Sequence, residues 1–207
     1  MATNSLISLT FDDGPRRHTE RLLDILERNN TRATFFVIGN LVEPGRNTIA
    51  RAAKIGNEIA GHSWTHPNLA RLSDQQIAEQ IRSTSTAIES VVGFFPHIYR
   101  PPFGSINHNV QRVSGELGYS IVNWTVDTLD WHYLNANVVY RTIMNNVKNG
   151  DIILLHDIHA TTINAMELVI PNLIAKGFKL VTVSELLTYK YGKLEPGIVY
   201  GGPRLII

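Results

Sequence analysis

The sequence predicts an α/β protein built on a parallel β-sheet. Short apolar runs rich in β-branched residues alternate with longer helix-like stretches about seven times along the chain. Such alternation is typical of parallel sheets, in which each strand needs a crossover connection to the next. Two architectures fit the pattern: a closed or incomplete (β/α) barrel and a doubly wound open sheet. The 207 residues show no internal repeat and no linker, so residues 1–207 are expected to form a single domain.

The first half of the chain contains four strand candidates. Residues 5–11 (SLISLTF) and 33–38 (ATFFVI) are short apolar runs of the kind that is buried in parallel sheets, and Glu58–Gly61 and Ile98–Tyr99 are shorter candidates. The helices expected after these strands span residues 18–29, 46–55, 73–92 and 107–117. Ser73 and Gln76 form a capping-box pattern at the start of the third helix.

The second half continues the alternation. Strands are expected at residues 120–126, 151–155 (DIILL) and 178–183, and helices at residues 137–147, 162–176 and 184–189. Pro171 is expected to kink the helix that contains it, because proline lacks the N–H that an α-helix needs. Residues 192–207 are rich in glycine and proline, which predicts an irregular, packed end rather than a further domain.

The composition excludes several classes of function. Lys and Arg total 19 against 18 for Asp and Glu, so the net charge of +1 gives no reason to expect a nucleic-acid partner. The absence of cysteine excludes disulfides, thiolate metal sites and cysteine nucleophiles, so any metal must bind to His, Asp or Glu. No apolar run is long enough to span a membrane. The chain begins without a signal-peptide pattern, which leaves a cytoplasmic protein and a trimmed leader as alternatives.

The polar residues that are most costly to bury follow the predicted strands directly. They are Asp12 and Asp13, then His62, Arg100, Asp127 and Asp130, and finally His156 and Asp157. The C-terminal ends of parallel strands converge on one rim, where ligands bind in α/β folds. Charged residues also prefer loops in general, but five strands that end in this way favour a functional site.

A metal site is predicted within this set. His62 and His66 are four residues apart, so on a helical turn both imidazoles would face the same way. Two histidines and a carboxylate with one open position are typical of a catalytic metal site. A lone HxxxH is weak, and capping or surface histidines are commoner, but the neighbouring Asp12-Asp13 pair favours the metal. His18, His97, His108, His132 and His159 lack such a setting and are expected mostly at the surface or behind the site.

The remaining rim residues suggest acid–base chemistry. Adjacent strand residues point to opposite faces, so one of Asp12 and Asp13 can bind a cation while the other is a base, although Asp-Asp-Gly-Pro also suits a tight turn. His156 is the residue type that a general acid needs near neutral pH, and Asp130 is a candidate to orient it. Arg100 lies in a stiff Arg-Pro-Pro segment that suits either a clamp on a carboxylate or a structural salt bridge.

Five motifs in order are similar to those of the NodB-homology polysaccharide deacetylases, carbohydrate esterase family 4. They are TFDDG (10–14), HSWTH (62–66), RPPFG (100–104), DTLDW (127–131) and LLHD (154–157). The resemblance covers nearly the whole chain and implies a distorted, incompletely closed (β/α) barrel.

The resemblance also implies a role for each motif residue. Asp13, His62 and His66 would hold a divalent metal, with zinc the first choice and cobalt or nickel as alternatives. The catalytic set would be Asp12 as general base held by Arg100, and His156 as general acid tuned by Asp130. The pocket for the acetyl methyl group would be lined by Trp131 and Leu154, and the amide of Phe103, where the family often has tyrosine, would bind the oxyanion.

The implied function is hydrolysis of acetyl groups from a polysaccharide. N-acetylglucosamine polymers, such as peptidoglycan or chitin oligosaccharides, are the leading substrates, and an acetylxylan esterase is the alternative. A non-catalytic carbohydrate-binding relative ranks lower, because the expected base, acid and metal ligands are all present. The exposed aromatics Trp64, Trp131 and Tyr133 are candidates for stacking on sugar rings. An extracellular or cell-envelope location follows from the family alone, and the oligomeric state is not predicted.

Overall fold

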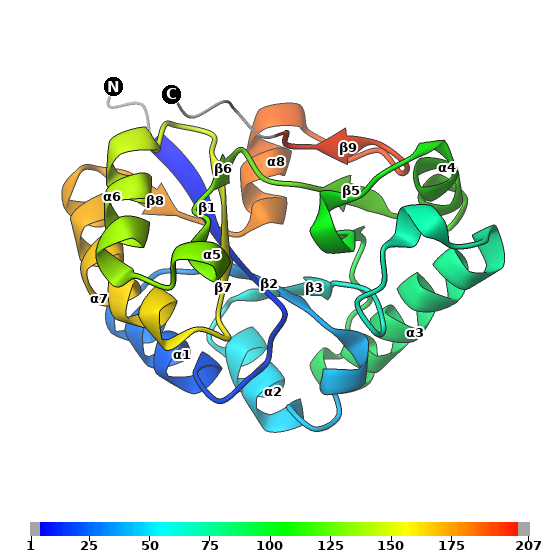
Figure 1. Cartoon of the computed structure of the whole chain (residues 1–207), viewed down its shortest axis with the longest axis horizontal. Coiled ribbons are helices and arrows are strands. Elements are labelled where there is room, and N and C mark those ends of the chain that lie inside the picture. The colour runs from blue at the N-terminus through cyan, green and yellow to red at the C-terminus, as the bar shows by residue number, and fades with distance from the viewer. Residues whose placement is uncertain (1–4, 203–207) are drawn as a thin grey trace.

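The computed structural model describes residues 5–202, and its centre is a curled β-sheet in which all strand pairs are parallel (Figure 1). The strands are β1 (Ser5–Asp12), β2 (Thr34–Val37), β3 (Glu58–Gly61), β4 (Ile98–Tyr99), β5 (Ser120–Val122), β6 (Val126–Asp127), β7 (Ile152–His156), β8 (Phe178–Leu180) and β9 (Val199–Tyr200). Their order is β6-β7-β1-β2-β3-β4-β5-β9, and β8 pairs with the first residues of β1. Within the described chain β6 and β9 do not pair with each other, so the sheet is an incompletely closed barrel, as expected.

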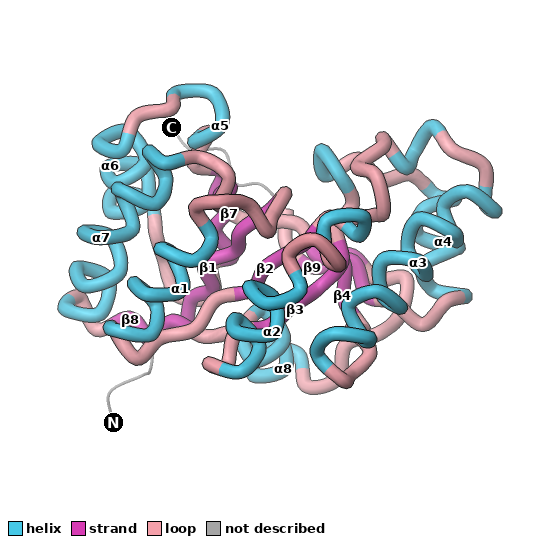
Figure 2. Tube along the Cα trace, turned by 90° about the horizontal axis from the view of Figure 1, so that it is seen from below, coloured by secondary structure: helices cyan, strands magenta, loops and turns pink. Residues whose placement is uncertain are grey.

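Helices surround this sheet. They are α1 (Thr19–Arg28), α2 (Arg46–Lys54), α3 (Asp74–Val92), α4 (His108–Glu116), α5 (Asp130–Tyr133), α6 (Ala136–Asn146), α7 (Ala160–Ala175) and α8 (Val183–Tyr191), with 3₁₀ turns at Gly39–Leu41, Leu69–Arg71 and Pro102–Gly104. Helices α6 and α7 lie on one flank and α3 and α4 on the other (Figure 2). Among residues 5–202 no helix is both long and apolar enough to cross a lipid bilayer.

The two faces of the strands bury different cores because side chains alternate along a strand. In β2, Phe35 belongs to the cluster that packs beneath α1, α2, α6 and α7. Its neighbour Phe36 belongs to a second cluster, which includes Leu186 and Leu187 of α8. Helix α8 begins at a capping box between Thr182 and Glu185, which ends the preceding strand earlier than expected. The helices therefore cover both faces of the sheet and leave its C-terminal rim for the site.

The sequence pattern predicts most elements within a few residues. The capping box between Ser73 and Gln76 is present at the start of α3. Helix α7 runs continuously through Pro171, and its start lies two residues before the expected one. Among residues 5–202 the structure has nine strands instead of the expected seven, because β6 and β9 were not expected as separate strands.

Two local predictions are wrong. The single strand expected at residues 120–126 is two strands: β5 pairs with β4 and β9, whereas β6 pairs with β7 at the opposite end of the sheet. The short helix α5 follows β6 directly and lies outside the helices expected from the sequence. The irregular end expected at residues 192–207 contains β9, which extends the sheet beyond β5, while residues 203–207 lie outside the described part of the chain.

Candidate active site

The predicted rim residues lie together at the C-terminal ends of the strands. Asp12 ends β1, Asp13 follows it with a φ of 72°, and His156 ends β7. Gly14 is required at the next position, because a Cβ there would lie 2.6 Å from the carboxylate oxygens of Asp157. Positive φ values recur around this rim, at Asp13, Ser63, His66, Phe103 and Leu129. The tight turns that aim these side chains hold them outside the usual allowed regions for residues with a Cβ.

Asp13, His62 and His66 form a metal-binding triad. Their potential ligand atoms all lie within 4.8 Å of one another. Asp13 Oδ1 lies 3.5 Å from His62 Nε2 and 3.3 Å from His66 Nε2. This oxygen is buried and has no hydrogen-bond partner among the described residues. A cluster of two imidazoles and one otherwise unsatisfied carboxylate oxygen fits a divalent cation.

The two histidines converge through a loop and not through the helical turn that their spacing suggested. Ser63 and His66 have φ values of 63° and 62°, which no α-helix contains. Ser63 Oγ accepts a hydrogen bond from the N–H of His66. Gln80 of α3 accepts hydrogen bonds from the N–H groups of Trp64 and Thr65. These side-chain bonds hold the loop in the shape that brings both imidazoles to Asp13.

The protonation states of the triad suit metal binding. His62 Nδ1 lies 2.7 Å from the carbonyl oxygen of Arg100, which can only accept, so Nδ1 carries the proton and Nε2 keeps its lone pair for the site. Burial lowers the pKa of His62 despite the carboxylates of Asp12 and Asp13. Burial would raise the pKa of Asp13, but the close approach of His66 and the charges of nearby histidines lower it to about 2.

Arg100 binds the other carboxylate of the pair. Its Nη1 donates to Asp12 Oδ1 at 2.7 Å and to Thr10 Oγ1 at 2.8 Å, and its side chain is fully buried. The guanidinium also donates to the carbonyls of Val122 and Asn123, at the opening of the barrel, and lies 4.1 Å from the ring centroid of Phe36. A guanidinium stays charged, so Arg100 places a permanent positive charge against the Asp12 carboxylate.

His156 is held by a second buried charged residue, Asp130. Asp130 Oδ1 lies 2.8 Å from His156 Nδ1, and Oδ2 accepts from the His156 N–H and the Thr162 hydroxyl. Burial alone would lower the pKa of His156. The hydrogen bond and charge of Asp130, with the charges of Asp12 and Asp13, outweigh burial and raise this pKa to about 9. The imidazole is therefore protonated at neutral pH, with Nε2–H on the side away from Asp130.

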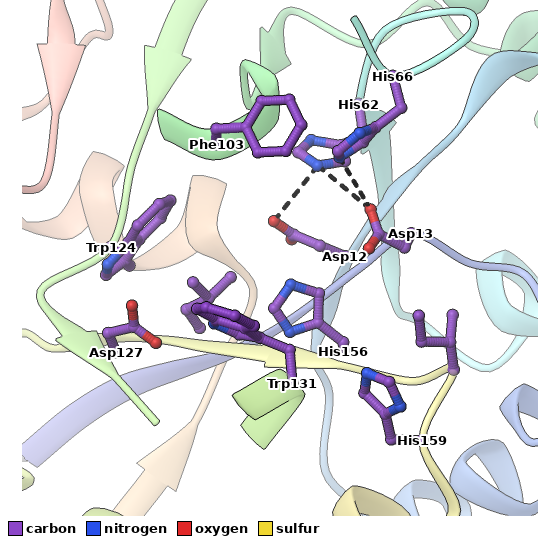
Figure 3. Close-up of a pocket in the computed structure, with 12 residues that line it drawn as sticks. Asp12, Asp13, His62, His66, Phe103, Trp124, Asp127, Trp131, His156 and His159 are labelled. Carbon is purple, nitrogen blue, oxygen red and sulfur yellow. Dashed lines mark ion pairs between the residues drawn. The ribbon is translucent and has the colours of Figure 1, made fainter. Parts of the chain in front are cut away.

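These groups share one pocket of about 550 Å³ (Figure 3). The described residues that line it are Asp12, Asp13, His62, His66, Phe103, Trp124, Asp127, Trp131, Leu154, His156, Ile158 and His159. In Figure 3, Asp13, His62 and His66 lie together on one side of the pocket, and Trp131 and His156 lie across the cavity from them. All three residues expected to form the acetyl pocket, Phe103, Trp131 and Leu154, are among the lining residues.

Phe103 has an unusual conformation within this lining. Its φ is 61°, its side chain lies edge-on to His66 with ring centroids 4.7 Å apart, and the residue is 67% exposed. Gly104 follows because a Cβ there would lie 2.8 Å from the Trp124 ring. Its ring therefore contacts His66 of the triad, while its backbone belongs to a tight turn at the pocket edge.

Sequence reasoning missed three lining residues, Trp124, Ile158 and His159. His159 had been grouped with surface or supporting histidines, but it lies beside His156, with ring centroids 6.3 Å apart. Its position three residues after the end of β7 was the signal that could have identified it. Trp64, expected as a sugar-stacking candidate, does not line this pocket: it packs on Gly39, where a Cβ would lie 2.4 Å from its ring.

Comparisons with known proteins identify the family. Residues 2–122 match the polysaccharide deacetylase family. The peptidoglycan-N-acetylglucosamine deacetylase PgdA of Listeria monocytogenes is 40% identical over 200 residues, which cover 96% of this chain and 41% of the relative. The chain thus spans about two fifths of that relative's length.

Two solved structures have the same fold. A T48 deacetylase with substrate has a TM-score of 0.90 at 36% identity and covers 96% of this chain and 98% of its own. A family 4 acetyl xylan esterase from Clostridium thermocellum in complex with a cobalt ion has a TM-score of 0.89 at 33% identity, with coverage of 95% and 98%. The chain belongs to the polysaccharide deacetylase family, carbohydrate esterase family 4.

Proposed function

We propose that this chain is a metal-dependent N-deacetylase of N-acetylglucosamine polymers in the cell envelope. The observation that carries the proposal is that two oppositely charged pairs, Asp12–Arg100 and His156–Asp130, face the Asp13-His62-His66 triad across one pocket. A carboxylate held by a guanidinium and a protonated imidazole beside a metal triad would supply the base and the acid that hydrolysis of an amide requires. The similarity to a peptidoglycan deacetylase supports the choice of polymer.

The proposed metal is zinc, with cobalt or nickel as alternatives. Two neutral imidazoles and one carboxylate accept several divalent cations, and a cobalt ion is present in the similar esterase structure. A divalent cation bound at this triad would act as a Lewis acid toward the acetyl carbonyl and would lower the pKa of water. The proton transfers and the hydrogen bond to the oxyanion are assigned to groups of the protein itself.

In the proposed mechanism, Asp12 accepts a proton from the water that attacks the acetyl carbon. Its other oxygen stays bound to Arg100, which orients the carboxylate. The backbone N–H of Phe103 is proposed to donate to the developing oxyanion, a contribution on the order of 3 kcal/mol. His156 then donates its Nε2 proton to the sugar nitrogen as the C–N bond breaks, and acetate and a free amine result. Trp131 and Leu154 are proposed to enclose the acetyl methyl group.

Acetate release by the zinc- or cobalt-loaded protein tests this proposal. N-acetylglucosamine oligomers and acetylated xylan are supplied side by side, and release from the oligomers is the expected result. Release from xylan alone would favour the acetylxylan esterase, an alternative supported by the similar esterase structure. Acetate from neither substrate would contradict the proposed activity.

Chelation provides a second test. Prolonged dialysis against a chelator is expected to abolish acetate release, and added zinc or cobalt is expected to restore it. The reason is that the cation held by the triad would polarise the acetyl carbonyl. Activity that survives a verified loss of metal would exclude a metal-dependent mechanism.

A further inference from the structure

The main pocket is one part of a longer groove. A second hollow of about 350 Å³ shares Asp13, His66 and Ile158 with it. A third hollow of about 280 Å³ shares Arg16 and Leu41 with the second. The second volume falls within the range of roughly 300–1,000 Å³ that is typical of ligand pockets. The triad therefore lies between two cavities, so a polymer with its acetyl group in one has room to continue into the other.

The second hollow is lined differently from the main pocket. Its polar side chains outside the triad are Arg16, Asn40 and Thr65, and it contains no aromatic side chain of Phe, Tyr or Trp. The main pocket has Phe103, Trp124 and Trp131 instead. Aromatic linings suit the apolar faces of sugars and acetyl groups, whereas a guanidinium, an amide and a hydroxyl suit a charged or strongly polar substituent.

Arg16 is the important residue of this hollow. It is exposed, and its guanidinium makes no ion pair with any residue in the part of the chain that the structure describes. The backbone of Arg16 is fixed, because its N–H donates to Thr19 Oγ1 at 2.9 Å. An exposed guanidinium without an ion-pair partner among the described residues, at the border of a groove, is suited to a planar anion.

We propose that the second hollow is a subsite for a sugar that carries a carboxylate, next to the acetylated sugar, and that Arg16 selects acidic glycans over neutral ones. This inference rests on the proposed function. Among N-acetylglucosamine polymers, the unit of that chemistry is N-acetylmuramic acid, whose 3-O-lactyl group ends in a carboxylate. Chitin and acetylated xylan backbones lack that group, so the subsite would distinguish an acidic peptidoglycan-type strand from both.

The test compares three tetrasaccharides of matched length. One is the neutral N-acetylglucosamine tetramer, one alternates N-acetylglucosamine with N-acetylmuramic acid, and one is the same alternating tetramer with its carboxylates converted to amides. The wild-type protein is expected to have a kcat/KM about fivefold higher for the acid than for its amide, which corresponds to about 1 kcal/mol for an exposed charge pair. Added salt should reduce this ratio.

Variants of Arg16 test whether this side chain causes the acid-to-amide ratio of kcat/KM. Arg16→Gln is expected to bring the acid-to-amide ratio close to one, and Arg16→Lys to keep part of it. Arg17→Gln is the matched control, because Arg17 is also exposed and cationic but does not line the hollow, and it should keep the wild-type ratio. Equal kcat/KM values for acid and amide in the wild type, or the same loss in both Gln variants, would overturn the subsite.

Binding measurements keep this inference separate from the proposed function. Calorimetric titration of the three tetrasaccharides needs no turnover, and the acid is expected to bind about fivefold more tightly than its amide in the wild type but not in Arg16→Gln. No acetate from any tetramer, together with this binding preference, would contradict the deacetylase and retain the subsite. Acetate release without any preference for the acidic tetrasaccharide would support the deacetylase and contradict the subsite.

Discussion

The two halves of the catalytic rim use the same arrangement with opposite charges. On the half formed by β1 and β4, a buried cation, Arg100, binds a carboxylate, Asp12. On the half formed by β7 and α5, a buried anion, Asp130, binds an imidazole, His156. Arg100 and Asp130 have no exposed side-chain surface, while Asp12 and His156 face the pocket.

The halves differ in how their charges depend on pH. A guanidinium stays charged at any ordinary pH, so the partner of Asp12 keeps its charge. The protonated form of His156 depends on the charge of Asp130 and is lost when the pH exceeds the raised pKa of about 9. The side chain proposed as base therefore lies against a permanent charge, whereas the charge of the side chain proposed as acid depends on pH. The following four changes test this difference.

Asp12→Asn should have the largest effect. The amide cannot accept the proton of the attacking water, so kcat is expected to fall by roughly 10³, within the range for loss of a positioned general base. Calorimetric titration should still show one bound zinc, because the triad is Asp13, His62 and His66. Asp74→Asn, in an exposed ion pair with Arg112, is the control and should retain full activity. Wild-type kcat in Asp12→Asn would remove Asp12 from the role of base.

Arg100→Met should cause the largest loss of stability. It leaves the Asp12 carboxylate buried without its cation, which is expected to lower the free energy of unfolding by about 3–5 kcal/mol. Urea unfolding of the metal-free protein measures this change. Arg112→Met removes two exposed ion pairs and should cost less than about 1 kcal/mol. Similar decreases in the free energy of unfolding for Arg100→Met and Arg112→Met would show that burial does not increase the contribution of the Arg100–Asp12 pair to stability.

Asp130→Asn should selectively weaken His156, the proposed acid. The amide removes the negative charge beside His156, so the pKa of His156 is expected to fall from about 9 towards its ordinary value, and kcat to fall by about 10². NMR titration of the metal-free protein follows the imidazole directly. Thr162→Val removes one hydrogen bond to Asp130 but keeps its charge, and should shift the pKa much less. An unchanged pKa of His156 in Asp130→Asn would contradict the idea that Asp130 sets the charge of His156.

The pH dependence of stability should show the smallest effect. Because the folded-state pKa of His156 is raised from 6.5 to about 9, its stabilisation is fully present below pH 6.5 and is lost as the pH rises through about 9. In the metal-free protein this contribution is on the order of 3 kcal/mol. Urea unfolding of wild type and His156→Gln at pH 6 and pH 9.5 isolates it. A difference between the two proteins that stays constant with pH would contradict the raised pKa.

The fold could be predicted where elements are long and regular. The alternation of apolar strands with helices predicts β1, β2 and β7 and the helices α1, α3, α6 and α7, because several turns or residues repeat one pattern. Strands β6 and β9 were not expected as separate strands: each has two residues, too few to show a period, and pairs with a strand far away in the sequence. The split between β5 and β6 has the same cause, since only the closure of the sheet shows that residues 123–125 pass from one end of it to the other.

The site could be predicted further than the fold because its residues follow the strands directly. The positions of Asp13, His62 and His66 bring them together as their spacing suggested, although through a loop stabilised by Gln80 and not through a helix. The contact of His62 with the Arg100 carbonyl could not be predicted, because it joins the backbone of one motif to the side chain of another. Nor does the sequence show that Arg16 borders a cavity.

The left-handed residues around the rim limit how this protein can be stabilised by engineering. Asp13, Ser63, His66, Phe103 and Leu129 each hold a conformation that glycine would adopt with less strain, at a cost on the order of 1 kcal/mol per residue. A screen for thermostability alone would therefore favour glycine at these positions, and most of those substitutions would remove a ligand or loosen the pocket. Asn30 and Leu134 share the left-handed conformation but line no part of this pocket. Glycine at those two positions gives evolution or design a way to raise the melting temperature without redirecting a single side chain of the site.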